Sequence, residues 1–207
     1  MSVRRAITEY DGIYFVTITC SGWRHLFHLS DGYAEVYKWF DHLKGQGHYV
    51  VGYVIMPNHL HALISFRNTQ GVSINSIIGE GKRFMSYGIV RRLRQANETD
   101  VISELSSIVK DTDRKRGKRH EVFEPSFDWK ECMSDKFICQ KLDYTHANQC
   151  KGNWALVADE CDYIHSSAKY YQKGEQGIYA ITSWTELKDI DLTKAITKTK
   201  AQSSRNG

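Results

Sequence analysis

Two histidines separated by one residue are the side chains of this chain best suited to chemistry. His59 and His61 lie in the segment YVIMPNHLHALISF (residues 53–66), directly after a Pro57-Asn58 break in a strand-like apolar run. Side chains alternate between faces along a strand, so both imidazoles are expected on one side, with Cα atoms ~7 Å apart. Imidazoles that point the same way can bind one metal ion. Two polar side chains in an apolar sheet also cost free energy, which a functional role would explain.

A second candidate group lies in the later segment DYTHAN (residues 143–148). Tyr144 and Asn148 are four residues apart, which predicts neighbouring positions on one helix face, with Cβ atoms ~6 Å apart. We expect His59, His61 and the Asn148 oxygen to hold a divalent metal, with Tyr144 beside it as a nucleophile. His146 would point away from this face and is left out of the metal site.

This set of side chains suits the cleavage of a phosphodiester. A DNA phosphate is an anion that resists attack by another anion, and Mg²⁺ or Mn²⁺ would neutralise that charge and polarise the P–O bond. Tyrosine has an ordinary pKa of ~10, and a nearby cation lowers it. Lys141, three residues before Tyr144, could supply such a charge or contact the phosphate, although a solvated helix lysine is the simpler interpretation.

The elements that must position these residues follow from hydrophobic periodicity. Residues 14–20, 49–56 and 59–66 read as strands, and the last two are expected to pair as a hairpin across the Pro57-Asn58 turn. Helices are predicted at 31–44, at 72–95 with a weak point at Gly79 and Gly81, and from a Ser134 N-cap to about Asn148. A short strand is predicted within 122–129. This order favours an α+β fold, a ferredoxin-like antiparallel sheet with helices packed on one face.

Composition narrows the class of protein without fixing it. The 207 residues carry a net charge of +4, which permits a nucleic-acid partner but does not demand one. The five cysteines form no CxxC pair, and their odd number argues against a disulfide framework. No signal peptide and no apolar run long enough for a membrane span is recognised, so a bacterial cytoplasmic protein, nucleoid-associated when bound to DNA, is expected.

Both candidate segments resemble those of one protein family. The segment MPNHLHALISF is similar to the His-hydrophobic-His motif of HUH endonucleases, in the form found in single-tyrosine transposases. Residues 123–157 resemble the catalytic-tyrosine helix of the REP-associated tyrosine transposases, and DYIHSSAKYY (162–171) resembles their aromatic-Ser-Ser segment. The resemblance covers roughly residues 10–174, with the motifs in the family's order.

The resemblance implies a metal-dependent single-strand DNA endonuclease and strand transferase with the HUH fold. It implies that Tyr144 forms a 5′-phosphotyrosine link beside a hairpin of palindromic repeats, and that His59, His61 and Asn148 bind the metal. It implies single-stranded DNA with hairpins as the partner, no membrane, and a monomer or a homodimer. The family usually reads Tyr-Ile-His-x-Asn-Pro-Val; here Thr145 replaces Ile and Gln149-Cys150 replaces Pro-Val, so the helix end is expected to differ.

Basic residues outside this centre are candidates for DNA contact through phosphate neutralisation, with solvated charge as the plain alternative. The candidates are Lys82, Arg83, Arg91, Arg114, Lys115, Arg116 and Lys141. A single domain is expected over residues 1–180. Residues 96–120 are expected to be a polar, partly flexible insertion, and residues 181–207 a disordered polar tail.

Two alternatives to an active transposase remain open. A protein that kept the fold but lost catalysis would bind hairpin DNA without forming a covalent adduct. An unrelated two-histidine metalloenzyme acting on a small molecule would be indifferent to Tyr144→Phe. A metallo-β-lactamase-like site is disfavoured because Leu63-Ile64 stand where that class has Asp-His, and a cupin because the chain has strong helices.

Overall fold

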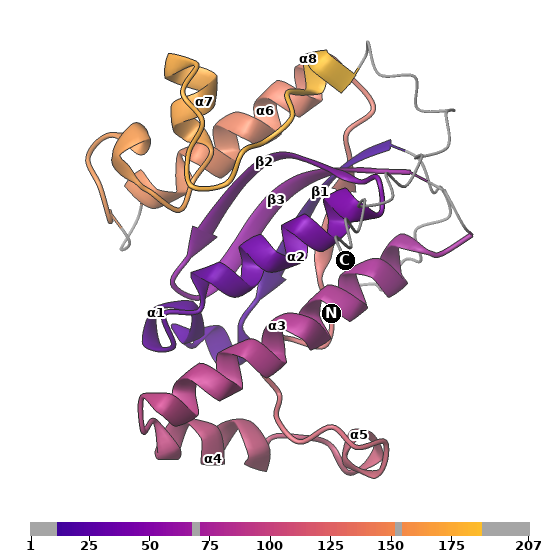
Figure 1. The fold of residues 1–207 in the computed structure, drawn as a ribbon, viewed down its shortest axis with the longest axis vertical. Helices are drawn as coiled ribbons and strands as arrows, with labels where there is room; N and C mark the ends of the chain where they lie inside the picture. Colours follow the sequence, from indigo (N-terminus) through magenta and orange to yellow (C-terminus); the bar gives the residue numbers. More distant parts are fainter. Residues whose placement is uncertain (1–11, 68–70, 152–154, 188–207) are drawn as a thin grey trace, which may run out of the picture.

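A four-stranded antiparallel sheet forms the centre of the protein (Figure 1). The computed structural model describes residues 12–67, 71–151 and 155–187. The strands are β1 (Gly12–Thr19), β2 (Tyr49–Met56), β3 (His59–Phe66) and β4 (Asp128–Glu131). Their order across the sheet is β2-β3-β1-β4, with β1 and β3 in the middle and every neighbouring pair antiparallel. The ferredoxin-like α+β fold expected from the sequence is therefore confirmed.

Helices cover both faces of this sheet, which corrects the expectation that they would cover one. The α-helices are α1 (Leu26–Leu29), α2 (Tyr33–Gly45), α3 (Ile74–Gln95), α4 (Thr99–Ser107), α5 (Asp111–Lys115), α6 (Asp135–His146), α7 (Ala168–Lys173) and α8 (Trp184–Leu187). Short 3₁₀ turns occur at η1 (Ser21–Trp23), η2 (Asn148–Cys150) and η3 (Glu160–Asp162). Figure 1 shows α2 and α3 on one side of the sheet and α6, α7 and α8 on the other.

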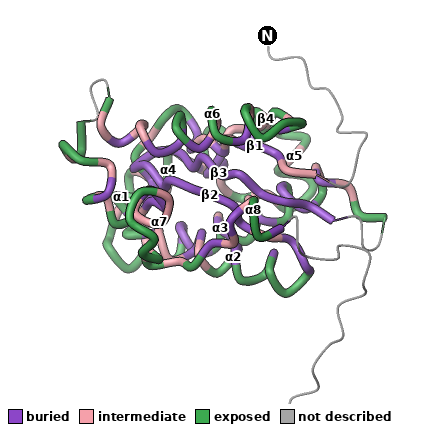
Figure 2. The backbone as a smooth tube through the Cα atoms, turned by 90° about the horizontal axis from the view of Figure 1, so that it is seen from above, coloured by how far each residue is buried: buried purple, intermediate pink, exposed green. Residues whose placement is uncertain are grey.

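Two hydrophobic clusters explain this three-layer arrangement. Alternate β1 side chains, Tyr14 and Val16 among them, belong to the larger cluster, which includes the apolar sides of α2 and α3. Phe15, which points the other way, packs in a smaller cluster with residues of α6 and α8. Because both faces of the sheet are apolar, both need a helical cover. Strands β2 and β3 and the central part of β1 accordingly run through the middle of the molecule as its buried layer, while β4 is an exposed to half-buried edge strand (Figure 2).

The β2–β3 hairpin is confirmed, and its two-residue turn is buried rather than exposed. The turn consists of Pro57 and Asn58, and its carbonyls accept hydrogen bonds from Cys20 N–H at 2.8 Å and Phe27 N–H at 3.0 Å. Backbone bonds of this kind satisfy polar groups that would otherwise be costly to bury. The turn that leads into His59 is therefore fixed by the end of β1 and by α1.

Helix α3 runs unbroken for 22 residues, so the expected weak point at Gly79 and Gly81 does not divide it. Gly81 instead lets α2 approach closely, because a Cβ at this position would overlap the Trp39 indole. Gly88 leaves space for the buried Glu35 carboxylate of α2 in the same way.

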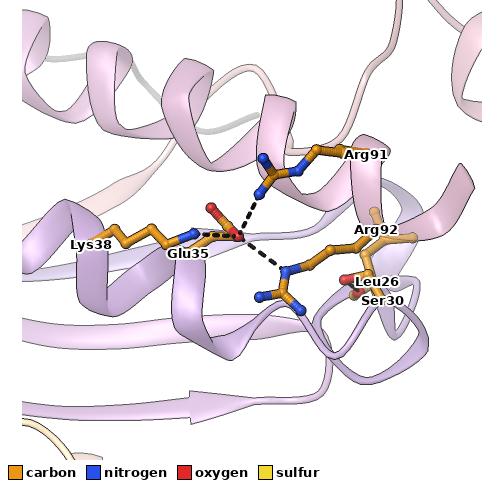
Figure 3. Close-up of polar contacts among 6 residues, drawn as sticks. All are labelled: Leu26, Ser30, Glu35, Lys38, Arg91 and Arg92. Carbon is orange, nitrogen blue, oxygen red and sulfur yellow. Dashed lines mark hydrogen bonds and ion pairs between the residues drawn. The ribbon is translucent and has the colours of Figure 1, made fainter. Parts of the chain in front are cut away.

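That carboxylate joins the two helices by ion pairs (Figure 3). Its Oε1 lies 3.0 Å from Arg92 Nε, 3.6 Å from Arg91 Nη2 and 3.0 Å from Lys38 Nζ. A buried carboxylate is stable when it is paired in this way. Glu35 therefore holds the guanidinium groups of Arg91 and Arg92 against α2.

Residues 96–120 and the start of the expected tail contain more structure than the sequence predicts. Residues 96–120 contain α4 and α5, and Leu105 of α4 is fully buried, so its apolar contact anchors the segment to the body. The tail was expected to begin at residue 181, yet Ile181 and Leu187 are buried and the Thr182 N–H donates to the Val50 carbonyl at 3.0 Å. Residues 188–207 lie outside the described part of the chain. No helix among the described residues is long and apolar enough to cross a lipid bilayer.

Candidate active site

The two histidines lie side by side on the sheet face that α6 covers. In the antiparallel register, His59 is opposite Thr19 and His61 is opposite Thr17 on β1. The imidazole centroids are 4.6 Å apart, and the side chains are 5% and 6% exposed. The expectation that both rings point to one side is therefore correct, and the two rings are close enough to share a ligand.

Hydrogen bonds to the Nδ1 atoms hold both rings in place. His59 Nδ1 lies 2.7 Å from Asn58 Oδ1, while the Asn58 amide nitrogen donates to the Trp23 carbonyl at 3.3 Å. The second bond orients the amide, so its oxygen faces the ring and His59 Nδ1 must carry the hydrogen. His61 Nδ1 lies 2.9 Å from Thr17 Oγ1. In both rings Nδ1 is engaged, which leaves Nε2 as the nitrogen that faces a cation; in His61 it carries the lone pair when Nδ1 donates to the Thr17 hydroxyl.

Burial keeps both imidazoles neutral near pH 7. It lowers the pKa of His59 to about 4, against a smaller upward effect of a hydrogen bond with the Asn148 side chain. It lowers the pKa of His61 to about 3, and the nearby His59 and the Lys141 ammonium lower it further. Neutral imidazole is the form that binds metals.

Helix α6 brings the candidate nucleophile to the histidines. The helix begins as predicted at Ser134, whose hydroxyl accepts from the Phe137 N–H at 3.3 Å. The Tyr144 ring meets the His61 ring edge to face, with centroids 5.3 Å apart, and the Phe15 ring at 5.8 Å. Tyr144 is 50% exposed. Its phenol therefore borders the histidine pair and is open to a large substrate from outside.

Lys141 lies over the aromatic side of this site. Its Nζ is 4.7 Å from the Phe15 ring centroid, 5.4 Å from that of Phe137 and 5.3 Å from that of Tyr144. Contacts of a cation with aromatic faces at such distances are favourable. The lysine is thus held beside the phenol by three rings, and this contact distinguishes it from a solvated helix lysine.

Asn148 reaches the site from just beyond the helix. Helix α6 ends at His146, and Asn148 opens the 3₁₀ turn η2, so Asn148 lies two residues past the end of the helix rather than inside it. Its side chain is still close enough to His59 to raise the pKa of that imidazole. His146 faces the interior instead, where its Nε2 lies 2.9 Å from Ser167 Oγ. Leaving His146 out of the metal site agrees with this geometry.

The donor set can bind a divalent cation and leave coordination positions open. It consists of two neutral imidazoles and a carboxamide; in the described part of the chain, no three or more His, Cys, Asp or Glu side chains are grouped to hold a metal. The amide oxygen is a ligand that suits Mg²⁺ and Mn²⁺, whereas imidazole nitrogen is more typical of Zn²⁺, Fe²⁺ or Ni²⁺. The residues present therefore fit a divalent cation without selecting Mg²⁺ or Mn²⁺ over the others.

The predicted DNA-contacting cations fall into four places. Lys82, Arg83, Arg91 and Arg116 line one groove between α3 and residues 116–131. Arg114 borders an adjoining hollow, where its Nη2 donates to the Ser106 carbonyl at 2.7 Å. Lys115 is exposed at the end of α5, and Lys141 lies at Tyr144. The structure does not test whether they contact DNA, so this stays a prediction.

Three residues of the site were not predicted from the sequence. Phe15 supports Tyr144 and Lys141, while Thr17 and Asn58 orient the imidazoles. Asn58 could have been noticed, because it directly precedes His59. Thr17 and His61 are 44 residues apart, and only the strand register brings them together.

Comparison with solved structures supports the fold at low sequence identity. The structure of a REP-associated tyrosine transposase bound to a REP hairpin matches with a TM-score of 0.59 and 16% identity, over 95% of this chain and 99% of that one. A Deinococcus radiodurans R1 protein, provisionally described as a transposase, matches at 16% identity over 70% of this chain and 95% of that one; its TM-score of 0.35 is too low to support a comparison of folds. The first match confirms the fold implied by the sequence resemblance.

Sequence-based comparisons add nothing to this result. No family model matches the chain, and the search of curated proteins gives no match.

Proposed function

We propose that the protein is a metal-dependent single-strand DNA endonuclease and strand transferase that uses Tyr144 as its nucleophile. One observation carries the proposal. Tyr144, Lys141 and Asn148, from α6 and the turn after it, lie close to the His59–His61 pair of β3, which is far away in the sequence. The fold shared with a REP-associated tyrosine transposase supports it. That protein's REP hairpin suggests hairpin-forming DNA as the substrate class.

Each side chain has a role that follows from its chemistry. His59 and His61 would hold Mg²⁺ or Mn²⁺ through Nε2, with the Asn148 amide oxygen as a third ligand. When bound, the ion would neutralise phosphate charge and polarise the P–O bond. Lys141, held over the Tyr144 ring, would stabilise the phenolate and attract the phosphate.

The covalent step exchanges one phosphoester for another. The phenolic oxygen of Tyr144 loses its proton to water and attacks the phosphorus, forming a tyrosine–phosphate bond as the bond from phosphorus to the 3′ oxygen breaks. The departing 3′ oxygen takes a proton from water. The 5′ end stays attached to the protein and the 3′ hydroxyl is free, so the reverse reaction can join a strand without ATP.

Covalent capture of labelled DNA tests the proposal. We would incubate the full chain with Mn²⁺ and single-stranded oligonucleotides that carry neighbouring genomic palindromes, labelled 3′ of the expected cut, and resolve the products on a denaturing gel. We expect wild-type protein, but not Tyr144→Phe, to migrate with the labelled fragment. His61→Ala should abolish the adduct as well, whereas Tyr49→Phe, at the end of the β2–β3 hairpin away from the histidines, should leave it intact.

The outcomes separate the alternatives. Hairpin binding without any adduct, in Mn²⁺ or Mg²⁺, would favour a DNA-binding protein that lacks catalysis. An adduct that persists in Tyr144→Phe would overturn the assignment of the nucleophile.

A further inference from the structure

A large groove of the described structure lies away from the histidines. It runs between α3 and residues 116–131 and has a volume of about 1380 Å³. Pockets for small molecules usually measure ~300–1,000 Å³, so this groove is large for a single small ligand. Its size indicates an extended occupant.

The groove concentrates the positive charge of the molecule. Its lining includes eight lysine and arginine side chains and four carboxylates. The net charge of the lining is therefore +4, which equals the net charge of the whole chain. Two of those carboxylates are engaged within the protein: Glu121 pairs with Lys118, and Glu124 Oε1 accepts from the Gly22 N–H at 2.8 Å. The groove is therefore complementary to a polyanion.

One wall alternates cations with an exposed aromatic ring. Arg83, Tyr87 and Arg91 succeed each other at four-residue intervals on α3, so they form a row of side chains about one helical turn apart. Tyr87 is 72% exposed and both arginine side chains are more than 60% exposed. An exposed tyrosine between two arginines gives a surface on which a base can stack while its flanking phosphates are neutralised.

Internal contacts hold both walls in place. Lys82 Nζ donates to the carbonyls of Glu124, Pro125 (3.2 Å) and Ser126 (3.3 Å), tying α3 to the opposite wall. The Glu35 carboxylate of α2 holds the Arg91 guanidinium through an ion pair, as Figure 3 shows. Lys82 therefore supports the groove, while Arg83 and Arg91 present charge to it.

We propose that this groove binds a single-stranded segment of nucleic acid, with Tyr87 as a stacking platform and Arg83, Arg91 and Arg116 as phosphate contacts. The proposal deepens the proposed function, because it assigns part of the DNA substrate to a second site. Strand β4 connects the two sites: its residues line the groove, and it pairs with β1, which carries Phe15 and Thr17. A strand that crosses the β4 edge of the sheet would pass from the groove toward Tyr144.

Fluorescence anisotropy with an unstructured probe tests the groove separately from cleavage. The probe is a fluorescein-labelled oligo(dT) of about 12 nucleotides, within the range of single-strand sites, measured with the full chain in EDTA so that no cutting occurs. We expect Tyr87→Ala to weaken binding at least about 5-fold, and Tyr87→Phe to retain it, because stacking needs the ring and not the hydroxyl.

Charge substitutions give a second readout. Arg83→Gln with Arg116→Gln should weaken binding and reduce the slope of log K against log salt by about 1.4, since each single-strand phosphate contact contributes about 0.7. Lys44→Gln with Lys173→Gln removes the same charge from exposed positions on α2 and α7, and should leave the slope nearly unchanged.

The possible results decide between explanations. Equal effects of the two double variants, or equal binding by Tyr87→Ala and Tyr87→Phe, would overturn the groove proposal even if the tyrosine adduct forms. If Tyr87→Ala weakens binding of a blunt duplex hairpin of similar length more than it weakens binding of oligo(dT), the single-strand assignment is overturned. Groove binding that follows these expectations without any adduct would instead count against the catalytic proposal alone.

Discussion

At the scale of single residues, the candidate site depends on side chains that orient others. The histidine pair offers Nε2 to a ligand because Asn58 and Thr17 engage Nδ1 of each ring. Partners of this kind fix the tautomer and direction of a metal-binding imidazole. The Thr17 hydroxyl makes this contact from β1, so the strand pairing itself sets the geometry of His61.

Removing the Thr17 hydroxyl should therefore weaken metal binding without changing the fold. For Thr17→Val, which keeps the branched shape, we expect the affinity for Mn²⁺ to fall about 10- to 100-fold in isothermal titration calorimetry. Thr17→Ser restores the hydroxyl and should recover most of the affinity. Equal affinity of all three proteins would show that this hydrogen bond does not orient His61.

The residues proposed to perform chemistry were easier to predict than the residues that support them. His59, His61, Tyr144 and Asn148 have types and short spacings that can be read within a few positions of the sequence. Thr17 and Phe15 are ordinary strand residues, and their roles arise from a register between strands that no local pattern encodes.

At the scale of elements, the close contact between α2 and α3 depends on two glycines. Glycine weakens a helix relative to alanine by about 1 kcal/mol, yet α3 runs unbroken through Gly81 and Gly88. The space at these two positions is occupied by Trp39 and Glu35 of α2. Packing between the helices thus offsets the lower helix propensity.

Alanine substitutions along α3 should separate propensity from packing. Gly81→Ala should lower the free energy of unfolding by about 1–3 kcal/mol in urea denaturation, because the new methyl group overlaps the buried Trp39 indole. Gly79, two residues earlier, has open space around it. Gly79→Ala should therefore raise the free energy of unfolding by roughly 0.5–1 kcal/mol. The same sign for both substitutions would contradict this account.

Sequence patterns predicted the elements that have a clear hydrophobic period. The hairpin and the helices that became α2, α3 and α6 follow from apolar spacing and from the Ser134 cap. Helices α1, α4, α5, α7 and α8 were missed because each has at most nine residues. Even α4, whose Leu105 is buried in the core with Val101 and Ile102 packed against it, is too short for its apolar spacing to stand out. Short helices carry too few turns for a period to be recognised.

At the scale of the whole molecule, burial keeps several histidines neutral. Apart from the candidate ligands, burial lowers the pKa values of His48, His146 and His165 to about 4. An unfolded histidine has an ordinary pKa of about 6.5. The unfolded chain therefore takes up protons first as the pH falls, and the native state loses stability.

His48 allows a direct test of this pH dependence. Its Nδ1 accepts a hydrogen bond from the Arg67 backbone N–H at 3.1 Å, and protonation there would break that bond. Neutral His48 stabilises the folded state by roughly 1–2 kcal/mol. This contribution to the free energy of unfolding is complete above pH 6.5 and is lost as the pH falls toward 4. His48→Asn keeps an acceptor but cannot titrate, so its stability should fall less between pH 7 and pH 4.5 in urea denaturation. Parallel curves for the two proteins would exclude a role for His48.

The central sheet also divides the protein into two compartments that can change independently over generations. The imidazoles and Tyr144 occupy one side, while α3, α4 and α5 occupy the other (Figure 1). Mutations that remodel the α4–α5 arm reach the histidines across a densely packed layer, which resists small displacements, or through one edge contact. That contact is the 3.0 Å ion pair of Glu104 in α4 with Arg24, next to Trp23, whose ring meets His59. Descendants of this chain that keep this ion pair can therefore diversify the rest of the arm while inheriting the histidine side intact.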